Sequence, residues 1–583
     1  MKKIFPKILI VISVVALGLI AFFSVEGAKN SSLIDVTVMS DVHFVSQKLF
    51  TADNYSAFAT EDKMEHLSEA VMNSVADEII AKKPRYLLIS GDLTERGDRI
   101  SHEELAKVLK RIENGGTNVY VINGNHDVPT NYYSLGNKVS ASEFKEIYAD
   151  FGYNEALSVF PGTLSYTADI AETHRLIAVD NIEYYVDSEG EIKKSALSAP
   201  HEEWIKEQAV KCKEEGRIPV IISHVPFKDH FPKAIASVND KSNYIALAEA
   251  LADVGAHYAF TGHLHLEDIK TVESSEGNVF YDIASPSMIH YPCTYRSVKL
   301  FDDGIDVKTV KNDYIDEKYL SEFSPEEERR EIAEGLQKYC VKHMKQEITT
   351  AVDGLDKPYG ILGSVVSGSG TTAEAARLAL RTVQKTLTAP LYKKDEKSGE
   401  TSLERVLADY DIALPVTEYK NVMDMSTVYA ASIFTGEKPL RDPEKEMIGY
   451  IAYFLIYNIN EARGEFNAIV PEINLDIDMK KLVTEGKLEC YDSGLVPLVF
   501  TVVGDNDLGS FVKGIIGESF DGLQSFKGVI DGFANEAVAG ITDYFSGKEI
   551  LLNSLIYDGV LAKYAPELTS RELHSSELRI IFN

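Results

Sequence analysis

The stretch that decides the fold is Ile122-Asn-Gly-Asn-His-Asp-Val128, which directly follows the apolar run 119–122. Gly, Asn and Asp are common in turns, so this stretch predicts a turn at the end of a strand. Its Asn, His and Asp side chains also offer oxygen and nitrogen atoms that can bind a metal ion. Taken alone the stretch is a modest signal, and its meaning comes from similar stretches elsewhere in the chain.

Four other short apolar runs also end in side chains that can bind metal. They lead into Ser40-Asp-Val-His43, Ser90-Gly-Asp92, Ser223-His224 and Thr261-Gly-His-Leu-His265. In α/β sheets, ligands bind at the carboxyl ends of strands, so we expect the five strand ends to meet in one crevice. The side chains that would meet there are Asp41, His43, Asp92, Asn125, His224, His263 and His265.

This set of side chains combines hard oxygen atoms with imidazoles and contains no thiolate. Such a mixture suits Mn, Fe, Zn or Co and does not choose between them. Seven ligands are too many for one tetrahedral ion, but they suit two ions that share a bridging carboxylate and keep water in their open positions. Five histidines outside this set are predicted to be ordinary core or turn residues, namely His102, His174, His230, His257 and His290.

The order Asp-x-His, Gly-Asp, Gly-Asn-His-Asp, His and Gly-His-x-His resembles the signature of the calcineurin-like metallophosphoesterases, over about residues 35–310. The resemblance implies an α/β fold, a layered αββα-type sandwich. It also implies two divalent or mixed-valence metal ions, bridged by Asp92. One ion would be held by Asp41, His43 and His265, and the other by Asn125, His224 and His263. In the family, the histidine at the position of His126 assists the leaving oxygen, and Asp127 would orient its ring.

The activity that this resemblance implies is hydrolysis of a phosphoester by a metal-bridging hydroxide, because metal-bound water has a pKa of about 7. Asp41-x-His43 and Gly91-Asp-Leu-Thr94 are similar to the phosphodiesterase branch of the family, so we expect a phosphodiester substrate. Two alternatives stay open: a phosphomonoesterase, and a catalytically silent surface-binding protein on the same fold. Other metal hydrolase patterns, such as His-Glu-x-x-His, do not occur in the sequence.

The charge balance limits the partners. The 59 basic and 90 acidic residues give a formal net charge of −31, which disfavours a nucleic-acid groove. A small phosphoester can still be attracted by the metal ions themselves. Because a diester carries less negative charge than a monoester, it costs less to bring to so acidic a protein.

The first residues predict export. Lys2, Lys3 and Lys7 precede the apolar run 8–23 and the small-residue stretch 24–28. This pattern is typical of a signal peptide in residues 1–28, and residues 8–23 would serve as a membrane anchor if they were not cleaved. Both alternatives predict an extracellular or cell-surface protein, secreted or membrane-anchored.

The remaining patterns suggest a division into a phosphoesterase domain at 33–313 and a mostly helical accessory domain at 314–583. In the first part, β-branched runs alternate with helical stretches at 63–81, 101–113, 201–214 and 242–254, and closely spaced strands follow His265. In the second part, a capping box at Ser324-Pro-Glu-Glu327 opens a run of helices, including 447–457 and 511–545.

Two loops and four cysteines complete the expectations. Loops 44–62 and 285–296 are predicted to be walls of the substrate site, with Arg296 available for a phosphoryl oxygen.

The cysteines are Cys212, Cys293, Cys340 and Cys490, and none forms a Cys-x-x-Cys pair. We favour free core thiols over disulfides, which the sequence cannot assign.

Overall fold

The computed structural model describes residues 33–60, 63–128, 138–186, 192–195, 197–230, 242–354, 370–435, 442–471, 475–480, 487–488, 550–551 and 577–581. The predicted export segment 1–28, the predicted helix 511–545 and Cys490 lie outside the described residues. Of the helices that are described, none combines the length and the apolar character needed to cross a membrane.

Two mixed sheets form the framework of the first half of the chain. The first has six strands in the order β17 (Glu577–Ile581), β14 (Gly304–Lys311), β13 (Thr294–Phe301), β1 (Ile34–Met39), β2 (Tyr86–Ser90) and β3 (Asn118–Ile122). The second has seven in the order β11 (Asp268–Glu273), β12 (Val279–Ala284), β10 (Tyr258–Thr261), β9 (Ile218–Ser223), β6 (His174–Val179), β5 (Tyr166–Asp169) and β4 (Ser158–Val159). Strands β1, β2 and β3 run parallel to one another, and so do β6, β9 and β10.

The strands carry apolar side chains on both faces because both faces of each sheet are covered. Along β9, Val220 and Ile222 pack in the core that includes side chains of both sheets. Ile221 between them points the other way and packs with residues of α6 (Ala199–Glu214) and α7 (Ser242–Asp253). This follows from the two-residue period of a strand, which places alternate side chains on opposite faces.

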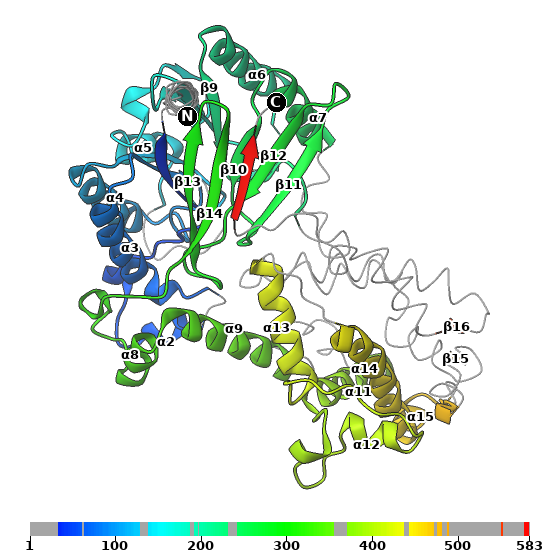
Figure 1. Cartoon of the computed structure of the whole chain (residues 1–583). Helices are drawn as coiled ribbons and strands as arrows, with labels where there is room; N and C mark the ends of the chain where they lie inside the picture. Colours follow the sequence, from blue (N-terminus) through cyan, green and yellow to red (C-terminus); the bar gives the residue numbers. More distant parts are fainter. Residues whose placement is uncertain are drawn as a thin grey trace, which may run out of the picture.

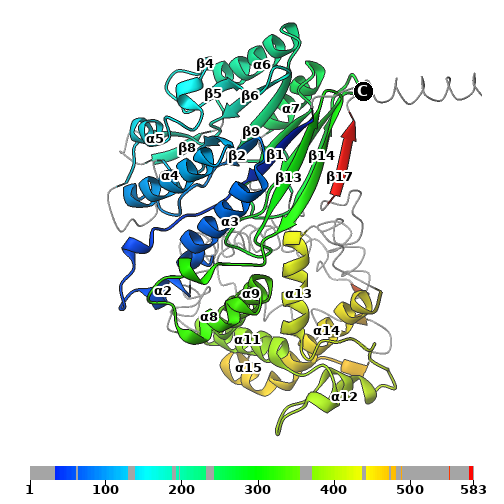
Figure 2. The same ribbon diagram turned by 60° about the vertical axis from the view of Figure 1, so that its left-hand side comes forward.

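Helices cover the outer faces of the paired sheets. Side chains of α3 (Ser68–Lys82) and α4 (Arg99–Asn114) join the core of the first sheet, and α6 and α7 pack on the second. Figure 2 shows these helices on opposite sides of the strands. The layered α/β fold expected from the sequence is therefore confirmed.

The second half of the chain is helical wherever longer stretches of it are described, as expected (Figure 1). Its helices are α8 (Glu326–Ala333), α9 (Leu336–Asp353), α11 (Thr371–Thr388), α12 (Leu403–Ala408), α13 (Val422–Thr435), α14 (Asp442–Glu461) and α15 (Arg463–Ile469). Helices α11 to α15 share a separate apolar core. The predicted capping box is wrong, because α8 begins at Glu326 with Pro325 at its N-cap, and the Ser324 hydroxyl donates to Glu328 instead.

Shorter elements connect these layers. They are α2 (Tyr55–Phe58), α5 (Ala141–Ile147), β7 (Glu183–Val186), β8 (Ile192–Ser195), β15 (Lys487–Leu488), β16 (Ile550–Leu551) and the 3-10 turns Gln47–Leu49, Glu65–Leu67, Tyr153–Glu155, Glu317–Tyr319 and Lys393–Asp395. Within the predicted wall 44–62, the rings of Phe50, Tyr55 and Phe58 are buried against one another and against Phe323. This part of the loop therefore packs on the start of the helical half.

The core of the two sheets continues past residue 313. Ile332 of α8 and Leu336 and Cys340 of α9 are buried in it. Strand β17 pairs antiparallel with β14, with Ile581 opposite Gly304 and Glu577 opposite Lys308. The last described residues of the chain therefore form the edge of the first sheet. Helical periodicity begins where the sequence predicts, but the packing of the phosphoesterase domain includes later residues.

Three of the cysteines are buried thiols. Cys212 lies in α6, and Cys293 and Cys340 lie in the core of the two sheets, with their Sγ atoms 3.0 Å apart. They agree with the expectation of free core thiols.

We expect Leu336→Ala to destabilise the phosphoesterase domain, because Leu336 is 0% exposed and fills the core of the two sheets. The cavity should cost about 2–5 kcal/mol. Urea unfolding followed by tryptophan fluorescence measures this change, since Trp204, the one tryptophan, lies in α6. Val341→Ala, a 38% exposed position on the same helix, is the control and should cost about 0.5 kcal/mol or less. Equal transitions for the two variants would show that α9 is not part of this core.

Candidate metal centre

The five strand ends singled out in the sequence meet in the structure. Residues after β1, β2 and β3 of the first sheet face residues after β9 and β10 of the second. All seven side chains expected to bind metal come together there. They form two groups, Asp41 with His43 and His265, and Asp92 with His224 and His263, and Asn125 lies beside the second group.

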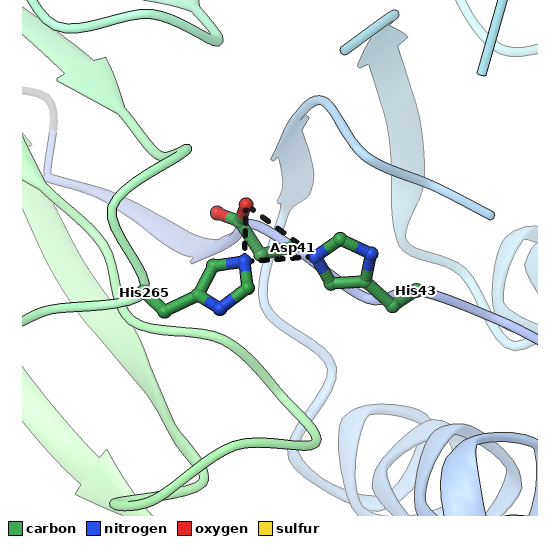
Figure 3. A group of neighbouring side chains, drawn as sticks. All are labelled: Asp41, His43 and His265. Carbon is green, nitrogen blue, oxygen red and sulfur yellow. Dashed lines mark hydrogen bonds and ion pairs between the residues drawn. The ribbon is translucent and has the colours of Figure 1, made fainter. Parts of the chain in front are cut away.

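The first group brings two imidazoles and one carboxylate to a common point (Figure 3). Nε2 of His43 lies 2.9 Å from Nε2 of His265, and Oδ1 of Asp41 lies 3.3 Å from the latter atom and 3.8 Å from the former. All three residues are buried. Ligand atoms about 2.1 Å from one ion and at right angles around it stand about 3 Å apart, so these separations suit a shared cation.

The second group is built in the same way around His224. Its Nε2 lies 3.0 Å from Oδ1 of Asn125 and 3.1 Å from Oδ2 of Asp92. Its other ring nitrogen, Nδ1, lies 3.0 Å from the backbone oxygen of Ser90. A proton on Nδ1 that is donated to this oxygen leaves Nε2 with its lone pair toward the site, as a metal ligand requires.

Asp92 lies between the two groups. Its Oδ2 is 3.1 Å from Nε2 of His224 on one side and 3.8 Å from Nε2 of His43 on the other. Its Oδ1 accepts a hydrogen bond of 2.8 Å from the backbone N–H of His126. Held in this way, the carboxylate presents one oxygen to both groups, which is the arrangement needed for a bridge.

The backbone at these positions is unusual. Asp41, His43, Asp92, His263 and His265 all have φ between +46° and +69°, in the left-handed region that side chains rarely adopt. Each such residue costs of the order of 1–3 kcal/mol, and such costs cluster at functional sites where the surrounding structure enforces them. These five residues lie on the three loops after β1, β2 and β10, and the sequence pattern did not reveal the feature that they share.

The charges of the site also favour cations. Asp41, Asp92 and Glu95 are buried carboxylates at the centre of the site. Burial alone would lower the pKa of His224, but Asp92 and Asp41 outweigh burial and raise this pKa to about 9. The carboxylates therefore stabilise positive charge among the imidazoles, and the residues present fit bound divalent cations.

His126 lies beside both groups, as expected of an acid that assists catalysis, but Asp127 does not orient its ring. Nδ1 of His126 is 2.6 Å from the backbone oxygen of Glu95 and 3.3 Å from its Oε1. The Asp127 carboxylate instead accepts hydrogen bonds from the backbone N–H groups of Leu93, Thr94 and Gly124 and from the Thr94 hydroxyl. Four donors fill the hydrogen-bonding capacity of one carboxylate. Asp127 therefore joins the loops after β2 and β3, and its predicted role is corrected.

Two buried charged residues beside the site were not singled out in the sequence, Glu95 and Lys63. Oε2 of Glu95 lies 2.7 Å from Nδ1 of His43, and Oε1 lies 2.9 Å from Nζ of Lys63. Glu95 follows Gly91-Asp-Leu-Thr94 directly, so its place on the same short loop as the predicted ligand Asp92 was a usable signal. Lys63 comes from a different segment, and nothing in the sequence indicated where it packs.

Arg296 does not serve the substrate. Its side chain is 0% exposed, and its guanidinium lies 3.0 Å from Glu267 and donates to the backbone oxygen of Ala284. The expectation that it contacts a phosphoryl oxygen is therefore wrong, because the side chain is buried and both of its Nη atoms are bound to Thr309, Ala284 and Glu267 inside the fold. Arg296 fixes the strands that follow the His263 and His265 loop.

The helical half reaches this loop through the end of α13, which points toward the sheets in Figure 1. The backbone oxygen of Phe434 accepts a hydrogen bond of 2.8 Å from the N–H of Glu267. The centroid of the Phe434 ring lies 4.5 Å from that of the His290 ring. The His290 centroid lies 5.8 Å from that of the His265 ring. The distant helix therefore supports the loop that carries His263 and His265.

The fold and site define a metal-dependent phosphoesterase class. Residues 34–267 match the model of the family described as calcineurin-like phosphoesterase. Residues 34–267 therefore carry the domain of this family, and the protein is a hydrolase of phosphoester bonds.

Solved structures similar to this chain cover 48% of it. They include a dimetal phosphatase from Danio rerio, at 13% identity over 96% of that chain with a TM-score of 0.35. A purple acid phosphatase from yellow lupin seeds has 12% identity over 52% of that chain and a TM-score of 0.32. GAP50, the anchor in the inner membrane complex of Plasmodium, has 11% identity over 84% of that chain and a TM-score of 0.28. No curated protein sequence matches.

We expect Gly124→Ala to weaken metal binding while the fold is kept. A Cβ atom at this position would overlap Oδ1 and the backbone nitrogen of Asp92, so the shared carboxylate has to move. Displacing groups that hold a metal ligand typically costs 10- to 100-fold in affinity, a range that calorimetric titration with Mn²⁺ can resolve. Gly464→Ala, where nothing lies within 4 Å, is the control and should bind as the wild type does. Unchanged affinity in Gly124→Ala would contradict the tight packing of this loop on Asp92.

Proposed function

We propose that this protein is an exported binuclear metallophosphoesterase that prefers phosphodiesters. The observation that carries the two-metal proposal is the position of Asp92, whose Oδ2 faces His43 of one candidate group and His224 of the other. In this proposal Asp41, His43 and His265 hold one ion, Asn125, His224 and His263 hold the second, and Asp92 is common to both. The ions are divalent or mixed-valence Mn, Fe, Zn or Co, which the donor set accepts.

Bound ions of this kind supply an activated water and neutralise charge on the phosphoryl oxygens. The chain itself supplies the proton for the leaving group. Burial alone would lower the pKa of His126, but the charges of Asp92 and Glu95 outweigh it and raise this pKa above its ordinary value. The two carboxylates thus favour the protonated form of the His126 ring. With Nδ1 held by Glu95, its Nε2 is the atom that gives the proton to the leaving oxygen.

The preference for a diester is supported by the net charge of −31, which opposes a substrate with a second negative charge more strongly than one with a single charge. The resemblance of Gly91-Asp-Leu-Thr94 to the phosphodiesterase branch points the same way. Export, and with it an extracellular or cell-surface location, is supported by the Lys-rich start and the apolar run 8–23. A small phosphoester is the proposed partner.

The test of the proposed activity compares bis(nitrophenyl) phosphate and nitrophenyl phosphate as substrates of the full chain. We expect hydrolysis of both with Mn²⁺, loss of both after chelation, and a higher kcat/KM for the diester. A kcat/KM that favours the monoester would replace the diester preference by the monoesterase alternative. No metal-dependent hydrolysis of either substrate would reject the proposed function.

We expect His126→Ala to lose rate mainly on substrates with poor leaving groups. An alkyl oxygen needs a proton to leave, and general acid catalysis of this kind is worth about 10²–10⁴ in rate. A nitrophenolate leaves with little help. The measurement is kcat on matched alkyl and nitrophenyl esters at saturating metal, with bound metal determined for each preparation. Equal losses on the two esters, with both metals bound, would argue against the acid role.

A further inference from the structure

One buried carboxylate touches both the predicted acid and a predicted metal ligand. Oε2 of Glu95 lies 2.7 Å from Nδ1 of His43, and Oε1 lies 3.3 Å from Nδ1 of His126. The backbone oxygen of Glu95 is also 2.6 Å from Nδ1 of His126. The rings of these two histidines meet edge to face, with centroids 4.7 Å apart. Glu95 therefore lies behind both rings, on the side away from their Nε2 atoms.

This position decides which nitrogen of each ring can act. An imidazole that carries its proton on Nδ1, next to a carboxylate or a carbonyl, presents Nε2 to its other neighbours. Nε2 of His43 lies 2.9 Å from Nε2 of His265, within the first metal group. Nε2 of His126 lies 3.9 Å from Oδ2 of Asp92, at the edge of the centre. Glu95 thus directs both working nitrogens toward the same place.

Lys63 supplies the charge that keeps this carboxylate in position. Its Nζ lies 2.9 Å from Oε1 of Glu95, and both side chains are only 7% exposed. A buried carboxylate without a partner costs several kcal/mol, so an ammonium beside it stabilises the ionised form and fixes the place of Oε1. The backbone next to Lys63 is also fixed, because the N–H of Met64 donates a hydrogen bond to the backbone oxygen of Ile289.

The same three side chains, His43, Glu95 and His126, also form a geometric group that could hold a metal ion. The Glu95 carboxylate already has a cation beside it, the ammonium group of Lys63. A second cation at this point would be repelled at close range in a buried environment. The group is better explained as support for the centre than as a third metal site.

We propose that Glu95 and Lys63 are positioning residues that orient His43 for metal binding and His126 for proton transfer. The proposal rests on the proposed function for the role of His126, and it stands on its own for the orientation of His43. It predicts that one substitution disturbs metal affinity and leaving-group dependence together. A residue that only stabilised the fold would change neither in a properly folded enzyme.

The experiment uses Glu95→Gln and Lys63→Met in the full chain, with Glu65→Gln as the matched control. Glu65 is also a buried carboxylate in an ion pair, 2.8 Å from Arg96, but its partner belongs to neither metal group. Metal binding is measured by calorimetric titration with Mn²⁺, and kcat and KM on alkyl and nitrophenyl esters at saturating metal.

For Glu95→Gln we expect a 10- to 100-fold loss of affinity at one of two metal sites, as is typical for groups behind a metal ligand. We also expect kcat on the alkyl ester to fall by about 10² or more, with a smaller loss on the nitrophenyl ester and KM within about twofold. Lys63→Met should change the same quantities in the same direction. Glu65→Gln should keep both the affinity and the ratio of the two rates.

Three outcomes would overturn the proposal. The first is a wild-type Mn²⁺ affinity together with a wild-type ratio of the two ester rates in Glu95→Gln or Lys63→Met. The second is a change of affinity and rate ratio in Glu65→Gln as large as in those variants. The third is the binding of three Mn²⁺ ions by the wild type. If the wild type hydrolyses no phosphoester, the proposed function fails, but the titration still decides whether Glu95 and Lys63 orient His43.

Discussion

The burial of the Asp92 carboxylate between two sheets is the constraint on which the rest of the structure depends. Its two oxygens have different tasks, because Oδ1 is held by the backbone of the β3 loop and Oδ2 faces imidazoles from both sheets. A carboxylate that is 1% exposed needs positive charge or donors around it. The surrounding loops satisfy this need by bringing histidines, backbone N–H groups and, in the proposed enzyme, metal ions to one point.

Close approach of these loops has a structural cost that the sheets offset. Five residues in the left-handed region and a glycine with no room for a Cβ are unfavourable in an isolated peptide. They persist because each follows a buried strand whose register is fixed by its neighbours. Asp127 strengthens the arrangement by joining the loops after β2 and β3 through its four hydrogen bonds.

The helical half contributes to this centre from a distance. Helix α9 fills part of the core of the two sheets with Leu336 and Cys340, and the end of α13 supports the loop of His263 and His265 through Glu267 and His290. The predicted boundary between residues 313 and 314 therefore describes a change of secondary structure. Packing crosses it in both α9 and β17.

The sequence by itself was sufficient for the layered α/β fold, for the family and for the seven side chains that meet, because each follows a short apolar run in a recognisable order. Such signals are local, and strand ends in an α/β fold converge by rule. The pairing of β17 with β14, the burial of Arg296, and the contacts of Glu95 with Lys63 were decided only by the tertiary structure. Each joins segments far apart in the chain, and no local pattern specifies which distant partner a buried charge or an edge strand will meet. Asp127 shows the same limit, since its place in a motif predicted a contact with His126 that backbone donors from the neighbouring loop took instead.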